Sequence, residues 1–469
     1  MFQPAIPQAG GLPLIGALPR FLRDPLTMLD EIRHQGNVCR LELGFLDAVT
    51  LHHPDHVDHV LRSHHRDYTK GGAFWSMIRE LLGNGLPVSE GDEWRRHRRM
   101  MQPQFHRQRL LGLATLIIDA LDECLEWSDL DSSWQTLDVG ARMPHLTMSV
   151  ASAALLGMNT SRDRSKLIAR ELDSMQDSLF SAMVAHRLPA WLPLPGRRRF
   201  AQSIAIVRHE VQNVIEERRQ RVESGDDLLG LLIDSSDEED GRTLSNEQLL
   251  DETISLYLAG YETTATSLQW ALALMGEHIE IWERLREECD MVLRGRNPRP
   301  SDVRRLPYAR WVIQESMRLY PPSWWLPRVA QCDDEIGGYP IPKDTVVAPV
   351  MYTVHRHPDF WENPTQFDPE RFSPSRSVGR HPLAWCPFGA GPRKCIGQEL
   401  SLMESTLALA MMTQRFDLAA SGQCPRVEMK TTLRPAEPVF LRMRRRRPAH
   451  RTITLSGISS SDSSSTMSL

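Results

Sequence analysis

The sequence lacks the signals of a membrane-spanning, secreted or disulfide-stabilised protein. It contains no run of about 18 apolar residues, and its N-terminus has no basic start followed by an apolar core. Its seven cysteines are scattered, odd in number and without the spacing of a zinc site. We therefore expect a protein of the reducing cytoplasm, without a membrane span.

Strong net charge and nucleotide-binding motifs are also missing. The formal net charge is only −5, so we do not expect the protein to bind nucleic acid. Neither a GxGxxG fingerprint nor a P-loop occurs, so the chain carries no nucleotide-bound source of electrons of its own. Hydrophobic residues make up 41% of the chain and charged residues 25%, a balance that allows a sizeable buried core.

The order of patterns predicts a mainly α fold with a smaller β-containing part. A helical pattern extends for roughly two hundred residues from residue 95. Short strand-like stretches occur in residues 38–51 and 345–350, and prolines crowd residues 321–392. We expect one catalytic domain over residues 1–455 and a disordered Ser-rich tail over residues 456–469.

Three segments of the helical part have distinct characters. The apolar, proline-rich residues 188–196 are expected to form a mobile lid over a pocket, with membrane contact as the alternative. The acidic residues 234–241 are typical of a solvated loop. Ser245 and Gln248 then form a capping box, which predicts the start of a long helix that runs past Trp270.

The most informative motif is FGAGPRKCIG, residues 388–397. Gly389 and Gly391 allow the backbone to turn sharply and to approach a flat macrocycle without a Cβ in the way. Phe388 can pack edge-on against such a ring and keep water from the sulfur of Cys395. A lone thiolate held in this way is typical of a ligand of haem iron, and the absence of CxxCH excludes the usual covalent haem attachment.

The surroundings of Cys395 favour the same interpretation. The cysteine is predicted to open an amphipathic helix, so that backbone N–H groups and the helix dipole favour the thiolate. Arg393 is placed to meet a haem propionate, a planar carboxylate that suits a guanidinium. The alternative is a buried structural cysteine, and several constrained identities within ten positions speak against it.

A second motif, AGYETT, lies in the interior of the predicted long helix. Ala259 and Thr263 are four residues apart and share a face. If the Thr263 hydroxyl turns toward the Ala259 carbonyl, or releases it, the helix can widen and hold oxygen and water beside a cofactor. Glu262 next to it can relay protons. Such back-bonding threonines are common in helices without any function.

Two further groups of charged residues support these motifs. Glu315 and Arg318 are three residues apart on one predicted helix face, and Arg371 in PERF is a possible third member of a buried network. Trp94 and Arg98, four apart, share a basic helix. The remaining arginines of that helix either solvate a surface or bind an anion.

In this order, AGYETT, ESMR, PERF and FGAGPRKCIG resemble the four hallmarks of the cytochrome P-450 haem-thiolate monooxygenases, of the soluble bacterial type. The resemblance implies a cytochrome P-450 fold with non-covalent haem b between the long central helix and the cysteine-loop helix. Cys395 would be the axial ligand of the iron, and Glu262 with Thr263 the acid–alcohol pair that delivers protons. The implied cofactor-binding residues are Cys395, Arg393, Trp94, Arg98, Arg328, Phe388, Gly389, Gly397 and Ala259.

The resemblance also implies an activity and its partners. The protein would insert one oxygen atom of O2 into a hydrophobic small molecule, by hydroxylation or epoxidation, in secondary metabolism. A terpenoid, a fatty acyl chain or a polyketide-like compound fits equally, because the candidate pocket segments, residues 73–78, 86–88, 323–327 and 431–433, are apolar and aromatic.

Electrons would come from a ferredoxin or flavodoxin with its reductase. The predicted docking surface is a basic patch of Arg95, Arg96, Arg99 and Lys394. A peroxide-driven or isomerising haem-thiolate enzyme and a non-catalytic haem sensor remain as alternatives. Neither of them explains the presence of both Glu262 and Thr263.

Overall fold

The computed structural model describes residues 5–44, 46–157, 196–220, 227–420 and 424–446, together with residues 164, 167, 168, 170–172, 174 and 175. The predicted tail, residues 456–469, and the predicted lid, except Gly196, lie outside the described residues. Among the described helices, none combines the length and the apolar character needed to cross a membrane.

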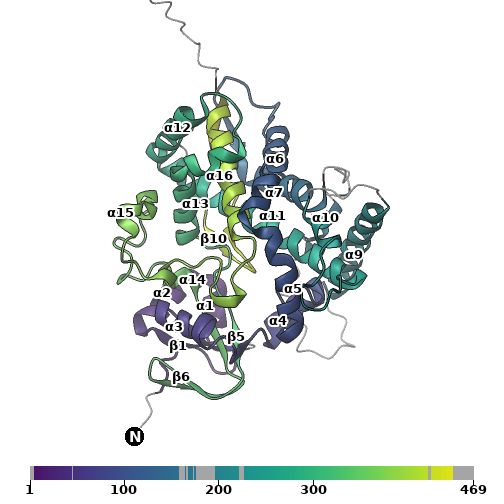
Figure 1. Cartoon of the computed structure of the whole chain (residues 1–469). Helices are drawn as coiled ribbons and strands as arrows, with labels where there is room; N and C mark the ends of the chain where they lie inside the picture. Colours follow the sequence, from purple (N-terminus) through teal and green to yellow (C-terminus); the bar gives the residue numbers. More distant parts are fainter. Residues whose placement is uncertain are drawn as a thin grey trace, which may run out of the picture.

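Helices make up most of the structure and strands form a smaller part, as predicted (Figure 1). The helices are α1 Leu18–Arg23, α2 Pro25–Gln35, α3 Pro54–Asp58, α4 Gly72–Leu82, α5 Gly91–Met101, α6 Arg107–Cys124, α7 Val139–Ala151, α9 Arg197–Arg219, α10 Leu228–Ile233, α11 Asn246–Glu277, α12 Ile279–Leu293, α13 Pro307–Leu319, α14 Met351–Val354, α15 Pro374–Ser377 and α16 Gln398–Arg415. The strands are β1 Val38–Glu42, β2 Asp47–Leu51, β3 Tyr68–Thr69, β4 Gln135–Asp138, β5 Arg328–Ala330, β6 Asp334–Ile336, β7 Tyr339–Ile341, β8 Val346–Pro349, β9 Phe416–Ala419, β10 Val427–Met429, β11 Leu433–Pro435 and β12 Phe440–Arg445.

The long helix α11 is the centre of the helical part. It begins with the predicted capping box, in which Ser245 and Gln248 each bond the other's backbone N–H. α7, α9, α13 and α16 pack against it. The indole of Trp270, fully buried, stacks on Tyr320 with ring centroids 3.9 Å apart and donates to the carbonyl of Leu433 at 2.8 Å. α11 is thereby fixed to the β-containing part.

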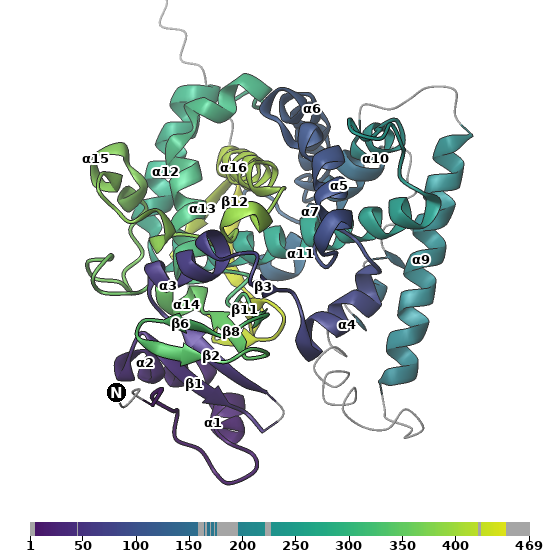
Figure 2. The same ribbon diagram turned by 60° about the horizontal axis from the view of Figure 1, so that its bottom comes forward.

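The main sheet lies at the side of the molecule opposite to α6 and α12 (Figures 1 and 2). Its strand order is β1-β2-β8-β5-β3, with β2 and β8 parallel and the other pairs antiparallel. The predicted strands in residues 38–51 and 345–350 are confirmed as β1, β2 and β8. The pairing of β3 with β5, Thr69 opposite Val329, joins segments about 260 residues apart in the sequence.

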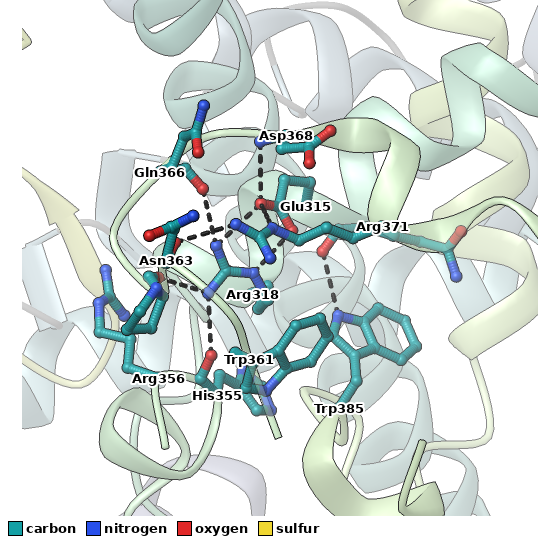
Figure 3. A network of polar contacts seen from close by, with 12 residues as sticks. Glu315, Arg318, His355, Arg356, Trp361, Asn363, Gln366, Asp368, Arg371 and Trp385 are labelled. Carbon is teal, nitrogen blue, oxygen red and sulfur yellow. Dashed lines mark hydrogen bonds and ion pairs between the residues drawn. The ribbon is translucent and has the colours of Figure 1, made fainter. Parts of the chain in front are cut away.

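The predicted network of Glu315, Arg318 and Arg371 is confirmed (Figure 3). Arg318 donates to both carboxylate oxygens of Glu315, at 2.7 and 2.8 Å, and Arg371 donates to Oε1 at 3.2 Å. The side chains of Glu315 and Arg318 are fully buried, and burial raises the pKa of Glu315 while the two guanidinium groups lower it. A charge pair in this setting is stable only while all its partners remain.

The same network reaches the cysteine loop. Arg318 donates to the carbonyl of His355 at 3.0 Å, and the imidazole Nε2 of His355 accepts the backbone N–H of Cys386 at 2.9 Å. The carbonyl of Cys386 in turn accepts the N–H of Gly389 at 2.9 Å. The buried ion pair on α13 therefore helps to set the position of the loop that carries Cys395.

We predict that Glu315→Gln lowers the free energy of unfolding by about 3–5 kcal/mol, because it leaves two buried guanidinium groups without their countercharge. Urea denaturation followed by circular dichroism measures this. The control is Glu283→Gln, which removes an exposed glutamate of the same ExxR spacing on α12 and should cost less than about 0.5 kcal/mol. Equal losses in the two variants would contradict the role assigned to the network.

Candidate active site

A cavity of about 320 Å³ lies between α11, the cysteine loop, α16 and α5. It brings together most of the predicted site residues. Those that line it are Trp94, Arg98, Ala259, Thr263, Arg328, Phe388, Gly389, Arg393, Cys395 and Gly397. Glu262 is not among the lining residues, although its neighbours in the sequence are.

The cysteine loop turns back on itself in front of α16. Gly389 and Gly391 have φ values of +70° and +67°, which explains why both positions are glycine. The group that lies close to Gly391 is the protein's own backbone, because a Cβ at this position would collide with the carbonyl oxygen of Leu61. The N–H of Cys395 donates to the carbonyl of Phe388 at 2.9 Å and closes the loop.

Cys395 does not open the following helix, contrary to the prediction. α16 begins at Gln398 with Gly397 as its N-cap, so the cysteine precedes the helix by three residues. The side chain of Cys395 is exposed and lines the cavity. Desolvation by the surrounding protein raises the pKa of its thiol, whereas the N–H of Gly397 and the positive charge of Arg98 lower it. The thiolate is thus supported by one N–H group and nearby cations.

Cys386, unlike Cys395, does not line the cavity. It is buried, its sulfur contacts the carbonyl of Leu383 and the sulfur of Met351, and burial raises the pKa of its thiol to about 12. Cys386 is therefore a structural cysteine.

Five cations line the cavity: Lys70, Arg98, Arg328, Arg393 and Lys394. The first four lie close together, since the charge of Arg393 lowers the pKa of each of the other three. Burial, together with the charge of Arg393, lowers the pKa of Arg328 to about 10. Burial also lowers the pKa of Lys70 well below its usual value, with Arg328 and Arg393 adding to the effect. These positive charges repel one another, so the wall favours an anionic occupant.

The sequence motifs did not reveal Lys70. It follows β3, and the pairing of β3 with β5 places it near Arg328. Its Nζ donates to the carbonyl of Pro87 at 2.5 Å and lies 4.7 Å from the ring centre of Trp75. A single lysine before two glycines carries no local signal of this role. The position of Lys70 beside Arg328 results from the pairing of β3 with β5.

The cation wall fits a haem with its two propionates. The guanidinium of Arg393 stacks over Trp94 at 4.2 Å and pairs with Glu90, yet its Nη1 has no hydrogen-bond partner among the described residues. The carboxylate of Glu90 thus pairs with Arg393 in a place where four positively charged side chains lie close together. Two more carboxylates from a bound group would supply the missing countercharge and acceptors.

On the α11 side, the hydroxyl of Thr263 donates to the Ala259 carbonyl at 2.8 Å, which is one of the two arrangements that the AGYETT motif left open. Glu262 points elsewhere, since its Oε1 accepts a hydrogen bond from the hydroxyl of Thr432 at 2.8 Å. The acid and the alcohol are neighbours in the sequence, but only Thr263 faces the cavity.

Two acids do line the cavity, Glu252 on α11 and Glu404 on α16, and neither was identified by the sequence analysis. Oε1 of Glu404 has no hydrogen-bond partner among the described residues, and burial raises the pKa of Glu404 well above the usual value. Glu404 lies four residues after Leu400, on the apolar stripe of the predicted helix. A charged residue inside that stripe was the signal that could have identified it.

The predicted basic patch on α5 is contradicted by the ion pairs that its arginines make. Arg96 lies 3.4 Å from Asp237, and Arg99 lies 2.8 Å from the same carboxylate. Arg95 pairs with Asp92. Asp237 belongs to the acidic residues 234–241 and is buried, so the prediction of a purely solvated loop is wrong at this position. The acidic segment neutralises the helix that was expected to attract a partner.

Three of the four pocket segments expected from the sequence contribute residues to the cavity wall. Trp75, Leu86, Pro87, Ser323 and Leu326 line the cavity, which agrees with three of the four segments. Residues 431–433 do not line it. The contribution of that last segment is the contact between Thr432 and α11 described above.

Comparisons with known proteins agree on one family. A family model described as cytochrome P-450 matches residues 5–443. The chain is 35% identical to cyclooctat-9-en-7-ol 5-monooxygenase of Streptomyces melanosporofaciens, over 87% of this chain and 88% of that protein. It is 30% identical to pentalenene oxygenase of Streptomyces avermitilis, over 87% and 90% of the two chains. A crystal structure of a cytochrome P-450 haem domain superposes with a TM-score of 0.83 at 26% identity, covering 94% of this chain and 97% of that one.

We predict that Lys70→Met accelerates the loss of haem by about 10- to 100-fold, because a charge-assisted hydrogen bond to a carboxylate contributes roughly 1.5–3 kcal/mol. Transfer of haem to excess apomyoglobin measures the rate. Lys343→Met, which changes an exposed lysine between β7 and β8, is the control and should retain haem like the wild type. Identical rates for the two variants would remove Lys70 from the haem site.

Proposed function

Because the chain belongs to the cytochrome P-450 family and is a monooxygenase of hydrophobic small molecules, we propose that Cys395 is the axial ligand of a haem b in the cavity described above. The observation that carries this proposal is the meeting of one cavity-facing thiol with four cations. When bound, the haem supplies the activation of O2, which electron donation from a thiolate promotes. The remaining tasks fall to the residues of this chain.

We assign the binding of the haem to three groups of residues. Lys70, Arg98, Arg328 and Arg393 hold the propionates, and Trp94 supports Arg393 from below its guanidinium plane. Phe388 and Gly389 cover the sulfur side, where Gly389 leaves space for a flat ring. Ala259 and Gly397 border the cavity with small or absent side chains, which allows a macrocycle to approach both elements closely.

The proton-delivery role belongs to Thr263 with Glu262. The Thr263 hydroxyl donates to the Ala259 carbonyl and can release it to orient a water molecule in the cavity. Glu262, held by Thr432, precedes Thr263 on the neighbouring face of the same helical turn and can pass a proton toward the alcohol from outside the cavity wall. Thr432 thereby joins the pair as a residue that positions the acid.

The substrate is proposed to be a terpenoid. Two relatives that cover most of this chain are named for cyclooctat-9-en-7-ol and pentalenene. The part of the cavity wall away from the cations consists mainly of apolar side chains, among them Leu155, Leu256 and Leu326. Such a wall suits a compact hydrocarbon skeleton.

The electron donor is proposed to be a separate ferredoxin or flavodoxin. The support is the absence of a nucleotide-binding fingerprint in the whole sequence. The arginines of the predicted basic patch on α5 form ion pairs with acids. For Lys394, which is exposed and directly precedes Cys395, no ion pair is seen among the described residues. The cytoplasmic location stays a prediction.

The axial-ligand proposal predicts the spectrum of the reduced protein with carbon monoxide. The wild type should show the red-shifted Soret band of a haem-thiolate protein, and Cys395→Ser should lose it. Cys386→Ser, the matched control, should keep the band, because the buried Cys386 does not face the cavity. A wild-type band in Cys395→Ser would overturn the assignment.

The proton-delivery proposal predicts the fate of reducing equivalents. Thr263→Ala should still bind haem and substrate but should release several-fold more hydrogen peroxide per electron consumed, since protons no longer arrive in order. The control is Thr253→Ala, which removes the same kind of bond, to the Leu249 carbonyl at 2.6 Å, outside the cavity wall. If peroxide release in Thr263→Ala matches that in Thr253→Ala, the hydroxyl of Thr263 has no part in proton delivery.

A further inference from the structure

Histidines are concentrated in one short stretch of the chain, around the start of α3. The chain has 17 histidines. Six of them fall within residues 52–65, namely His52, His53, His56, His59, His64 and His65. Short His-rich tracts are typical of metal binding. The contacts of each histidine decide whether this interpretation applies to it.

Two of these histidines are explained by the fold. His52 is fully buried, and its two ring nitrogens lie 3.0 Å and 2.7 Å from the hydroxyls of Thr50 and Thr353. Nε2 of His59 lies 2.7 Å from the carboxylate of Asp334. Both rings therefore serve to connect neighbouring elements.

His53 differs, because it meets metal-binding residue types from a distant part of the chain. It directly precedes α3, whereas His357 and Asp359 follow α14. In Figures 1 and 2, α3 and α14 lie side by side. A ring nitrogen of each of these two histidines and a carboxylate oxygen of Asp359 all lie within 4.8 Å of one another. Tetrahedral zinc requires its nitrogen and oxygen ligands to be about 3.3 Å apart, so small side-chain rotations suffice.

His357 presents a ring nitrogen that suits a metal ion. Its Nε2 lies 3.1 Å from Oδ1 of Asn37, so Nε2 carries the proton and Nδ1 the lone pair. Nδ1 lies 3.8 Å from the carboxylate of Asp359 and accepts its backbone N–H at 3.3 Å, a long contact that an ion can replace. A polar partner on the second ring nitrogen, here Asn37, is what orients metal-binding histidines.

His53 is oriented in a comparable way. Its Nδ1 caps α3 by accepting the N–H of Asp55 at 3.2 Å, and it lies 3.5 Å from the carboxylate of the same residue. The ring of Phe360 packs against His53 and His357, with centroids 5.1 Å and 5.3 Å away. Capping of α3 explains His53 alone. It does not explain why His357 and Asp359 are found beside it.

The site is accessible to an ion from solvent. The side chain of His357 is 6% exposed and that of His53 19%, whereas that of Asp359 is 72% exposed. An ion can thus reach the carboxylate first and the buried imidazole second. The charge of Arg33 also acts on His357, but Arg33 lies 3.9 Å from Asp30, which offsets it.

We propose that His53, His357 and Asp359 bind a zinc ion, with water as the fourth ligand. Two imidazoles and one carboxylate are a ligand set that zinc favours. The ion joins segments about 300 residues apart in the sequence, and closure of so long a loop restricts the unfolded chain much more than the folded one. None of the three residues lines the haem cavity, so the site and its role in stability are independent of the proposed haem chemistry.

Equilibrium dialysis of the haem-loaded, full-length protein against zinc chloride tests the proposal. The protein is prepared without a histidine tag, and bound zinc is measured by mass spectrometry. The wild type should bind one zinc ion tightly. His357→Gln, Asp359→Asn and His53→Asn should each bind it about 100-fold more weakly, since each lacks one ligand. Asparagine at position 53 still caps α3, so this variant separates metal binding from capping.

Two matched variants and a second readout make the test specific. His64→Asn changes an exposed histidine of the same stretch and should bind zinc like the wild type. Asn37→Leu removes the oxygen that orients His357 and should weaken binding about tenfold. Zinc should raise the midpoint temperature of unfolding of the wild type and of His64→Asn but not that of His357→Gln, because an ion that binds only the folded protein stabilises it.

The opposite results would overturn the proposal. Wild-type affinity for zinc in His53→Asn or His357→Gln would show that these residues are not ligands. An equal loss of affinity in His64→Asn would assign zinc to the exposed histidines in general. Zinc that binds without raising the unfolding midpoint of the wild type would contradict the joining of the two segments.

Discussion

The accumulation of positive charge on one wall of a buried cavity is the constraint on which the account of this protein depends. Lys70, Arg98, Arg328 and Arg393 come from four different parts of the chain and repel one another where they meet. Placing buried like charges side by side costs free energy unless an anion lies beside them. A haem with two propionates supplies this negative charge, and the thiol of Cys395 in the same cavity completes the requirements of a haem-thiolate site.

The fold places these charges through a few long-range contacts. The β3–β5 pairing positions Lys70 beside Arg328, and α5 contributes Trp94 and Arg98. The buried network of Glu315, Arg318 and Arg371 connects through His355 and Cys386 to the cysteine loop. The β-containing part thus positions one side of the site, and the helical part, through α11 and α16, provides the other.

The sequence predicted the elements whose signals are local. The capping box at Ser245 and the strands in residues 38–51 depend on residues within a few positions of one another, and both are present. The predictions failed where distant segments meet. Arg96 and Arg99 looked like a free basic surface because no sequence pattern indicated that Asp237 folds onto them. Lys70 was missed for the same reason, since its role arises from a strand pair about 260 residues apart in sequence.

The central claim is that the thiol and the cation wall serve one haem. A crystal structure of the haem-loaded protein tests it most directly. The account predicts that the sulfur of Cys395 is bonded to the iron and that the propionates contact Lys70, Arg98, Arg328 and Arg393. An axial ligand other than Cys395, or propionates that point away from these four residues, would contradict it.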